Sequence, residues 1–227
     1  MKKKYFATAC LLIIFILSSC VGRKAVNYFP VPDSGISKDE EIISIDVGNI
    51  IQTKGGSTRQ IPAWLRSFLN GGIEAVEKMD AYSNKYVFIG INEGENITVL
   101  NKWVDFYTVA QDFPMLAAAR IGKRMYLTAT LYPDDEYGAF YEAMIHNAYN
   151  AEYPDAVKED NYWIKTKSEN AEAPSENYKF FVLVTIEKML MQTNIRNMMT
   201  KAIADVTMTA IQSNSVNRLR NAFFEGF

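Results

Sequence analysis

The 227-residue chain contains one histidine and two cysteines, which limits the kinds of reactive site that it can form. A Ser-His-Asp triad or a histidine-rich metal site has to be built around His146 alone. This histidine stands between Ile145 and Asn147 in a segment with the pattern of a helix. We therefore expect no catalytic role for His146.

A hydrophobic run long enough to span a membrane is also missing at the N-terminus. The apolar segment 5–17 has thirteen residues and includes Thr8, whereas a spanning helix needs about 20 apolar residues. Lysines at 2–4 precede the segment and serines at 18–19 follow it, the arrangement of a secretory signal peptide. We expect residues 1–19 to be removed.

Cys20 directly follows this expected cleavage point. The string Leu17-Ser18-Ser19-Cys20 resembles the lipobox of bacterial lipoproteins, which implies that Cys20 is acylated, for example with palmitate. Each buried CH₂ of an acyl chain stabilises attachment by about 0.8 kcal/mol, so several chains hold a domain firmly at a bilayer. The alternative is an ordinary signal peptide with a chance cysteine, and Cys10 is simply lost with the peptide.

Cleavage leaves Cys20 as the only cysteine, and lipidation uses its thiol. An intramolecular disulfide, thiol chemistry and a cysteine-ligated metal site are then excluded. The loss of three lysines lowers the formal net charge from −2 to about −5, which argues against general nucleic-acid binding. The remaining 208 residues are enough for one large domain.

The mature chain divides into three parts. Residues 20–40 hold the lipidated cysteine and a tether with two prolines, residues 41–212 form a single α+β domain, and residues 213–227 form a C-terminal tail. We expect this tail to dock on the domain or on a partner, because exposed aromatic side chains are costly. The aromatic residues concerned are Phe223, Phe224 and Phe227.

Four segments have the composition or alternation of β-strands. They are residues 41–52 at an edge, residues 85–91 with both faces buried, and residues 162–167 and 178–188. The last two are expected to pair antiparallel through a long hairpin, because a parallel return needs a crossover of a dozen or more residues. Apolar residues on both faces of 178–188 indicate a central strand.

Helical spacing covers three further segments, residues 112–131, 136–149 and 190–212. Asp112 is expected to cap the first, with Pro114 in its first turn, and Asp134 or Asp135 the second. A stripe of mostly small residues on the first helix is expected to pack against the sheet: Met115, Ala118, Ala119, Gly122, Tyr126 and Ala129. The predicted fold is α+β, an antiparallel sheet of about three to four strands with long helices packed on it.

Four pieces occur in an order that resembles a known family. They are Pro62-x-Trp64, the strand 86–90, the alanine-rich helix 117–120 and the late strand 178–184. Over roughly residues 61–190 the chain is similar to the twenty-kilodalton bacterial lipoproteins, a family that includes outer-membrane lipoproteins of flagellar assembly. The resemblance implies helices on an antiparallel sheet and a structural or assembly role in the envelope. None of these motifs is catalytic.

Two local clusters have a structural explanation beside a functional one. The acidic run Asp134-Asp135-Glu136 offers oxygen ligands for a divalent cation, but its spacing is not that of a calcium loop and helix capping explains it. Residues 90–94, Gly-Ile-Asn-Glu-Gly, follow a strand, but their spacing is not that of a dinucleotide loop. We expect a capped helix and a turn, with no metal and no cofactor.

Two larger sets of side chains leave alternatives open. Arg120, Lys123 and Arg124 either form a solvated helix face, which we favour, or meet lipid headgroups or an anionic wall polymer. A set of methionines either packs in the core, which we favour, or forms an adaptable binding groove. These methionines are Met189, Met191, Met198, Met199 and Met208.

The resulting functional hypothesis is a non-enzymatic scaffold or assembly lipoprotein of the cell envelope. Membrane lipid would be bound through Cys20, and an envelope protein or a second copy of the chain is the expected macromolecular partner. The expected location is the cell envelope, where the chain is lipid-anchored to a membrane outside the cytoplasm, with the outer membrane favoured. The alternative is a wall-modifying enzyme that uses two carboxylates, and the sequence does not single out which two.

Overall fold

A computed structural model describes residues 49–57, 60–132, 135–168 and 175–227. These belong to one compact unit, and the expected signal peptide (1–19), Cys20 with its tether (20–40) and residues 41–48 of the first predicted strand lie outside them. The described elements are β1 (Ile50–Thr53), α2 (Ala63–Glu77), η3 (Asp80–Tyr82), β2 (Lys85–Gly94), α3 (Ile97–Phe106), α4 (Val109–Ala129), α5 (Gly138–Tyr149), β3 (Val157–Ser168), β4 (Ser175–Glu187), α6 (Lys188–Asp205), α7 (Ala210–Phe223) and η4 (Phe224–Gly226). The predicted α+β class is confirmed.

The four described strands form one antiparallel sheet in the order β1-β3-β4-β2. Ile89 of β2 pairs with Leu183 of β4, and Ile164 of β3 pairs with Lys179 on the other side of β4. The predicted antiparallel pairing of β3 with β4 and the central position of β4 are therefore confirmed. β2 is an edge of the described sheet.

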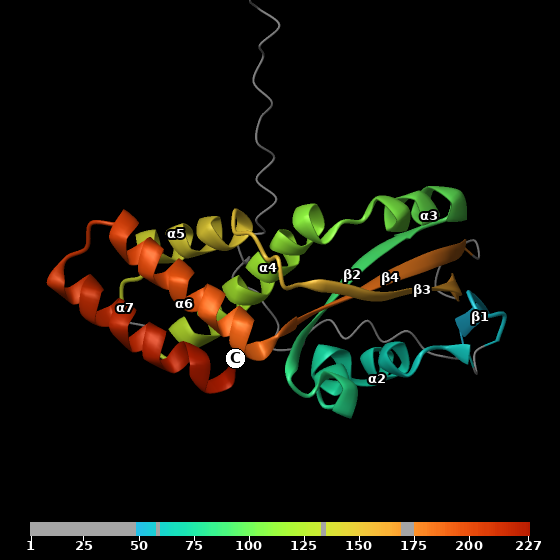
Figure 1. Ribbon diagram of the computed structural model, residues 1–227, viewed down its shortest axis with the longest axis horizontal. Helices are drawn as coiled ribbons and strands as arrows, with labels where there is room; N and C mark the ends of the chain where they lie inside the picture. Colours follow the sequence, from blue (N-terminus) through green and yellow to red (C-terminus); the bar gives the residue numbers. More distant parts are fainter. Residues whose placement is uncertain (1–48, 58–59, 133–134, 169–174) are drawn as a thin grey trace, which may run out of the picture. The chain divides into compact units, whose positions relative to one another are not determined.

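Both faces of the sheet are covered, which explains why β2 and β4 are apolar on two sides. Figure 1 shows α2 and α3 on opposite sides of the strands. Phe181 and Leu183 of β4 pack with Trp64 and Leu65 of α2. The alternate β4 side chains, Phe180, Val182, Val184 and Ile186, pack with the helices of the other face. Each such burial contributes roughly 1.5 to 3 kcal/mol.

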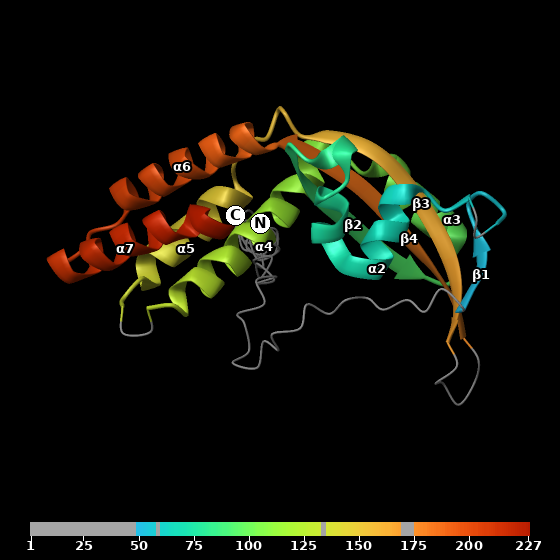
Figure 2. The ribbon, with the colours of Figure 1, turned by 90° about the horizontal axis from the view of Figure 1, so that it is seen from below.

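Helices α5, α6 and α7 gather beyond one end of the sheet, with α4 reaching from the sheet into this helical group (Figure 2). The helix predicted over residues 190–212 is wrong, because α6 ends at Asp205 and Val206 has an extended backbone. Thr209 and Gln212 form a reciprocal capping box that starts α7. Residues 213–223, expected in a tail, continue this helix.

The buried face of α4 differs from the predicted stripe. Met115 is 56% exposed and Ala119 is exposed, so these two positions were wrongly assigned to the contact. The buried face includes three large side chains, Phe113, Ile121 and Met125, together with the small Ala117 and with Ala118, which is buried as predicted. Gly122 is buried as predicted, but against Ile145 and Tyr141 of α5 rather than a strand. The predicted stripe is offset by about one residue from the centre of the buried face, because large apolar side chains define this face together with the small ones.

Three local predictions also need correction. α4 begins at Val109, so Asp112 is not its N-cap and Pro114 lies beyond its first turn; the Asp112 carboxylate accepts a hydrogen bond from the Thr108 N–H at 2.8 Å. The segment 90–94 is not a turn but the second half of β2. A Cβ on Gly90 would lie 3.2 Å from Cε2 of Tyr107, so a glycine lets this ring approach the strand.

Candidate functional site

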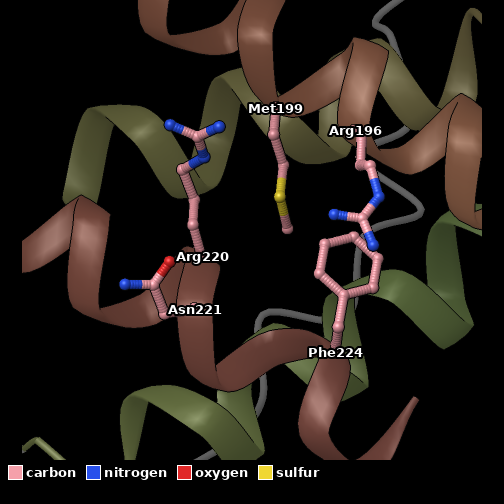
Figure 3. Close-up of a pocket in the computed structure, with 5 residues that line it drawn as sticks. All are labelled: Arg196, Met199, Arg220, Asn221 and Phe224. Carbon is pink, nitrogen blue, oxygen red and sulfur yellow. The ribbon is translucent and has the colours of Figure 1, made fainter.

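A hollow of about 270 Å³ lies between the last two long helices of the chain. Five residues line this α6–α7 hollow: Arg196, Met199, Arg220, Asn221 and Phe224. Figure 3 shows Arg196 and Met199 entering it from α6, and the other three from α7 and the turn that ends it. Met199 lies between the two arginines in this view.

The helical repeat places these residues on facing sides of α6 and α7. Met199 is three residues after Arg196, and Phe224 is four residues after Arg220, so each pair shares one helix face. Met199 is buried and Phe224 half-buried, which anchors the apolar part of the hollow in the core. Arg196, in contrast, is exposed and Arg220 is half-buried.

The Arg196 guanidinium lies over the Phe224 ring, 4.2 Å from its centre. A cation over an aromatic face is attracted by the ring, and at exposed sites the interaction contributes about 0.5 to 1 kcal/mol. No described carboxylate forms an ion pair with Arg196 or Arg220. The ring therefore orients a guanidinium whose N–H groups are left for another acceptor.

Arg218, two residues before Arg220, has a different role. Its guanidinium pairs with the Asp135 carboxylate, with Nε donating to Oδ2 at 2.8 Å. Hydrogen bonding from Arg218 lowers the pKa of Asp135, while burial, followed by the nearby Asp135 charge, raises the pKa of Tyr137 to about 12. α5 has no side-chain cap, so the expected capping role of Asp135 is wrong. The carboxylate joins α7 to the start of α5 instead.

Arg120 lies at the edge of the sheet, so the predicted solvated helix face is wrong for this residue. Its Nη1 donates to Oε1 of Glu77 at 2.7 Å and to the Val87 carbonyl at 2.9 Å. The same Glu77 oxygen accepts the Val87 N–H at 2.7 Å. Glu77, Arg120 and Val87 thus form a sheet-edge clip that joins α2, α4 and β2. The Arg120 guanidinium also lies 4.8 Å from the centre of the Tyr86 ring.

Arg124 is likewise committed to the fold. Its Nε donates to the Phe223 carbonyl at 2.8 Å and its Nη2 to the Ala222 carbonyl at 3.1 Å. These are carbonyl groups at the C-terminal end of α7, where a cation is favourable. The expectation of a solvated face is therefore wrong for Arg124 too, whereas Lys123 is exposed.

The remaining candidates are placed as follows. His146 is exposed near the end of α5, with Ile145 beside it in contact with α4.

Of the methionines, three lie buried in the core as favoured, namely Met191, Met198 and Met199. Met208 is partly buried against the core, and Met189 is 81% exposed. Among described residues, no group of three or more His, Cys, Asp or Glu side chains is placed to hold a metal ion.

The C-terminal phenylalanines pack on the domain. Phe223 is buried, and its ring stacks on that of Phe227 with centres 5.0 Å apart. Phe227 also lies 4.8 Å from the Tyr86 ring, close to Arg120. This aromatic cluster fixes the end of α7 beside β2 and α4, and so positions the turn that carries Phe224.

Two observations bear on surfaces that contact other molecules. Within the part of the chain that the structure describes, no helix combines the length and apolarity needed to cross a membrane. On α3, Val99 is 61% exposed and Phe106 75% exposed, and their seven-residue separation puts them on one face.

Comparison with known proteins gives no significant match, whether with family models, curated proteins or solved structures. The site therefore has to be interpreted from its own chemistry. The sequence interpretation missed Arg196 and Arg220, although a signal was present. Residues 188–227 carry five basic and two acidic side chains in a chain that is acidic as a whole.

Proposed function

We propose that the chain is a lipoprotein of the bacterial cell envelope that is anchored through acylated Cys20 and acts by binding rather than by catalysis. The observation that carries this proposal is the string Leu17-Ser18-Ser19-Cys20 after a short apolar segment with three lysines before it. The resemblance to twenty-kilodalton lipoproteins supports the same role. The proposed location is the cell envelope, with the outer membrane as the anchoring membrane.

Three described carboxylates have lowered pKa values and are therefore unsuited to act as the general acid of the alternative enzyme. Hydrogen bonds from Arg218, Lys85 and Lys165 lower the pKa of Asp135, Glu159 and Glu176, respectively. A glycosidase needs one carboxyl group whose pKa is raised, so that it is protonated at neutral pH. None of these three carboxyl groups suits that role.

Metabolic labelling with a palmitate analogue tests the anchor. We expect Cys20→Ala to abolish labelling and to release the protein from membranes washed with high salt. Cys10→Ala is the matched control, because it removes a cysteine from the same N-terminal segment without touching the lipobox. Retention of the Cys20→Ala protein on washed membranes, or equal loss of label in both variants, contradicts the anchor.

Incubation of the purified processed protein with isolated peptidoglycan tests the second half of the proposal. We expect no time-dependent release of soluble fragments. Release that stops when a single carboxylate is replaced by its amide would establish the wall-modifying enzyme instead. Boiled protein serves as the control for contaminating hydrolases.

The proposed macromolecular partner is an envelope protein or a second copy of the chain. The exposed α3 face with Val99 and Phe106 offers apolar surface for such a contact. Sedimentation of the full-length protein in neutral detergent, with and without Phe106→Ser, distinguishes a second copy of the chain from a different envelope protein as the partner. A dimer that is lost in the variant indicates self-association, whereas a monomer in both samples indicates a different protein.

A further inference from the structure

The C-terminal segment 188–227 differs in charge from the rest of the mature chain. Residues 188–227 carry a net charge of +3, whereas residues 20–187, with 16 basic and 24 acidic side chains, carry −8. At physiological ionic strength charges interact over about 8 Å, so a ligand responds to the local charge rather than to the total. The α6–α7 hollow, with Arg196 and Arg220 on its rim, lies in the basic part.

The hollow offers more hydrogen-bond donors than a single carboxylate can accept from. Each guanidinium has five N–H groups and a full positive charge, and the Asn221 amide adds two donors. A carboxylate has one negative charge and two oxygens. A phosphate monoester has a charge of about −1.5 to −2 at neutral pH and three strong acceptor oxygens. We propose that the α6–α7 hollow, which Arg196 and Arg220 both line, is a binding site for a phosphate monoester group.

The apolar lining indicates what is attached to the phosphate. Met199 and Phe224 form the apolar part of the hollow, which suits a carbon substituent next to the anionic group. The volume of about 270 Å³ is just below the roughly 300 Å³ at which pockets begin to enclose drug-sized ligands. The hollow therefore takes the phosphate and its first substituent, and the rest of the molecule stays outside.

Pre-orientation of Arg196 favours binding. Stacking on Phe224 at 4.2 Å already restricts this guanidinium in the free protein, so less conformational entropy is lost when an anion binds. This inference goes beyond the proposed function and does not depend on Cys20, since a phosphate monoester can belong to a lipid headgroup or to a soluble molecule.

Calorimetric titration of the full-length protein in neutral detergent with phenyl phosphate tests the site. At about pH 7.5 the probe is close to its dianionic form. We expect saturable 1:1 binding, weakened about tenfold or more by Arg220→Gln and by Arg196→Gln, as for the loss of hydrogen bonds to a charged group. Lys201→Gln is the matched control, because it removes one exposed cation from α6 outside the hollow. The affinity of this control variant for phenyl phosphate should change less than about twofold.

Two further measurements sharpen the result: the binding of benzoate, and the binding of phenyl phosphate to the protein in lipid vesicles. Benzoate has the same ring and a carboxylate, so we expect it to bind more weakly than phenyl phosphate. In phosphatidylcholine vesicles containing phosphatidic acid, a lower apparent affinity for phenyl phosphate than in vesicles given the same surface charge by phosphatidylglycerol, a phosphate diester, indicates a lipid headgroup as the natural source. Equal affinity in both vesicles indicates a soluble phosphate monoester.

Three outcomes overturn the proposal. The first is the absence of saturable binding of phenyl phosphate by a protein whose circular dichroism is that of a folded α+β domain. The second is equal weakening by the variants at 196, 220 and 201, which means unspecific attraction to a basic surface. The third is benzoate binding as tightly as phenyl phosphate, which means a carboxylate site. Each can occur whether or not Cys20 is acylated, so failure here is distinct from failure of the anchor.

Discussion

Arginines at the sheet edge and arginines at the α6–α7 hollow have the same chemistry but different partners. Arg120 meets a carboxylate and a backbone carbonyl, and Arg124 meets two carbonyls. Arg196 meets only an aromatic ring among described residues, and Arg220 no described carboxylate. The difference shows that the fold uses the first pair for stability, whereas the donors of the second pair have no described protein acceptor and belong to the proposed phosphate site.

The largest expected effect comes from opening the sheet-edge clip. Arg120→Met should lower the free energy of unfolding by about 3 kcal/mol, because it leaves the half-buried Glu77 carboxylate and the Val87 carbonyl without their partner. Urea unfolding monitored by circular dichroism measures this loss of stability. Lys102→Met, at an exposed position, is the control. A loss no larger than that of the control would remove the contrast between the two arginine pairs.

A smaller effect tests how closely the α4 region is packed. Gly122→Leu should cost about 1 to 3 kcal/mol, because even a Cβ at this position would lie 2.9 Å from Cδ1 of Ile145. Ala119→Leu, on the exposed side of the same helix, should change stability by less than about 0.5 kcal/mol. Equal losses in thermal unfolding of the two variants contradict the assignment of the buried face.

The pH dependence of the free energy of unfolding tests the ion pair between Lys85 and Glu159, another contact that the fold uses for stability. Hydrogen bonds from Lys85 and then from Thr185 lower the pKa of Glu159 below its ordinary value near 4.5. Its stabilising contribution is therefore present above about pH 4.5 and is lost as the pH falls through the lowered value. We expect Glu159→Gln to flatten the acid side of the stability profile by less than about 1 kcal/mol, since the pair is partly exposed. An unchanged profile contradicts this coupling.

The smallest effect on stability is expected at the hollow. Arg220→Gln should change the free energy of unfolding by less than about 0.5 kcal/mol, because no described carboxylate depends on this guanidinium. The measurement is the same urea titration used for Arg120→Met. A loss near 3 kcal/mol would show that Arg220 is as structural as Arg120, and the two regions would no longer differ.

Local patterns predicted the antiparallel sheet and helices α4, α5 and α6, but not α2, α3 or most of α7. Alternation in residues 178–188 predicted a central strand, because both parities are apolar and both faces of β4 are covered. The split between α6 and α7 was also visible in principle, since Thr209 and Gln212 have the spacing of a capping box. Helical periodicity on both sides concealed it.

The partners of the arginines could not be predicted in the same way. Arg120 is 43 residues from Glu77 in the chain, and Arg124 is 99 residues from Phe223. Sequence spacing describes neighbours within one element, whereas these contacts depend on how α2, α4 and α7 are arranged around the sheet. Four similar arginines therefore look alike in the sequence and separate into two classes only in three dimensions.

The clip at Val87 also affects how the domain meets other proteins. β2 is an edge of the described sheet, and an edge strand with free backbone groups can pair with a strand of another molecule, which is a route to aggregation. At Val87 both the N–H and the carbonyl are already occupied, by Glu77 and Arg120. The ion pair thus blocks intermolecular strand addition at this point of the edge, so its loss should increase self-association as well as unfolding.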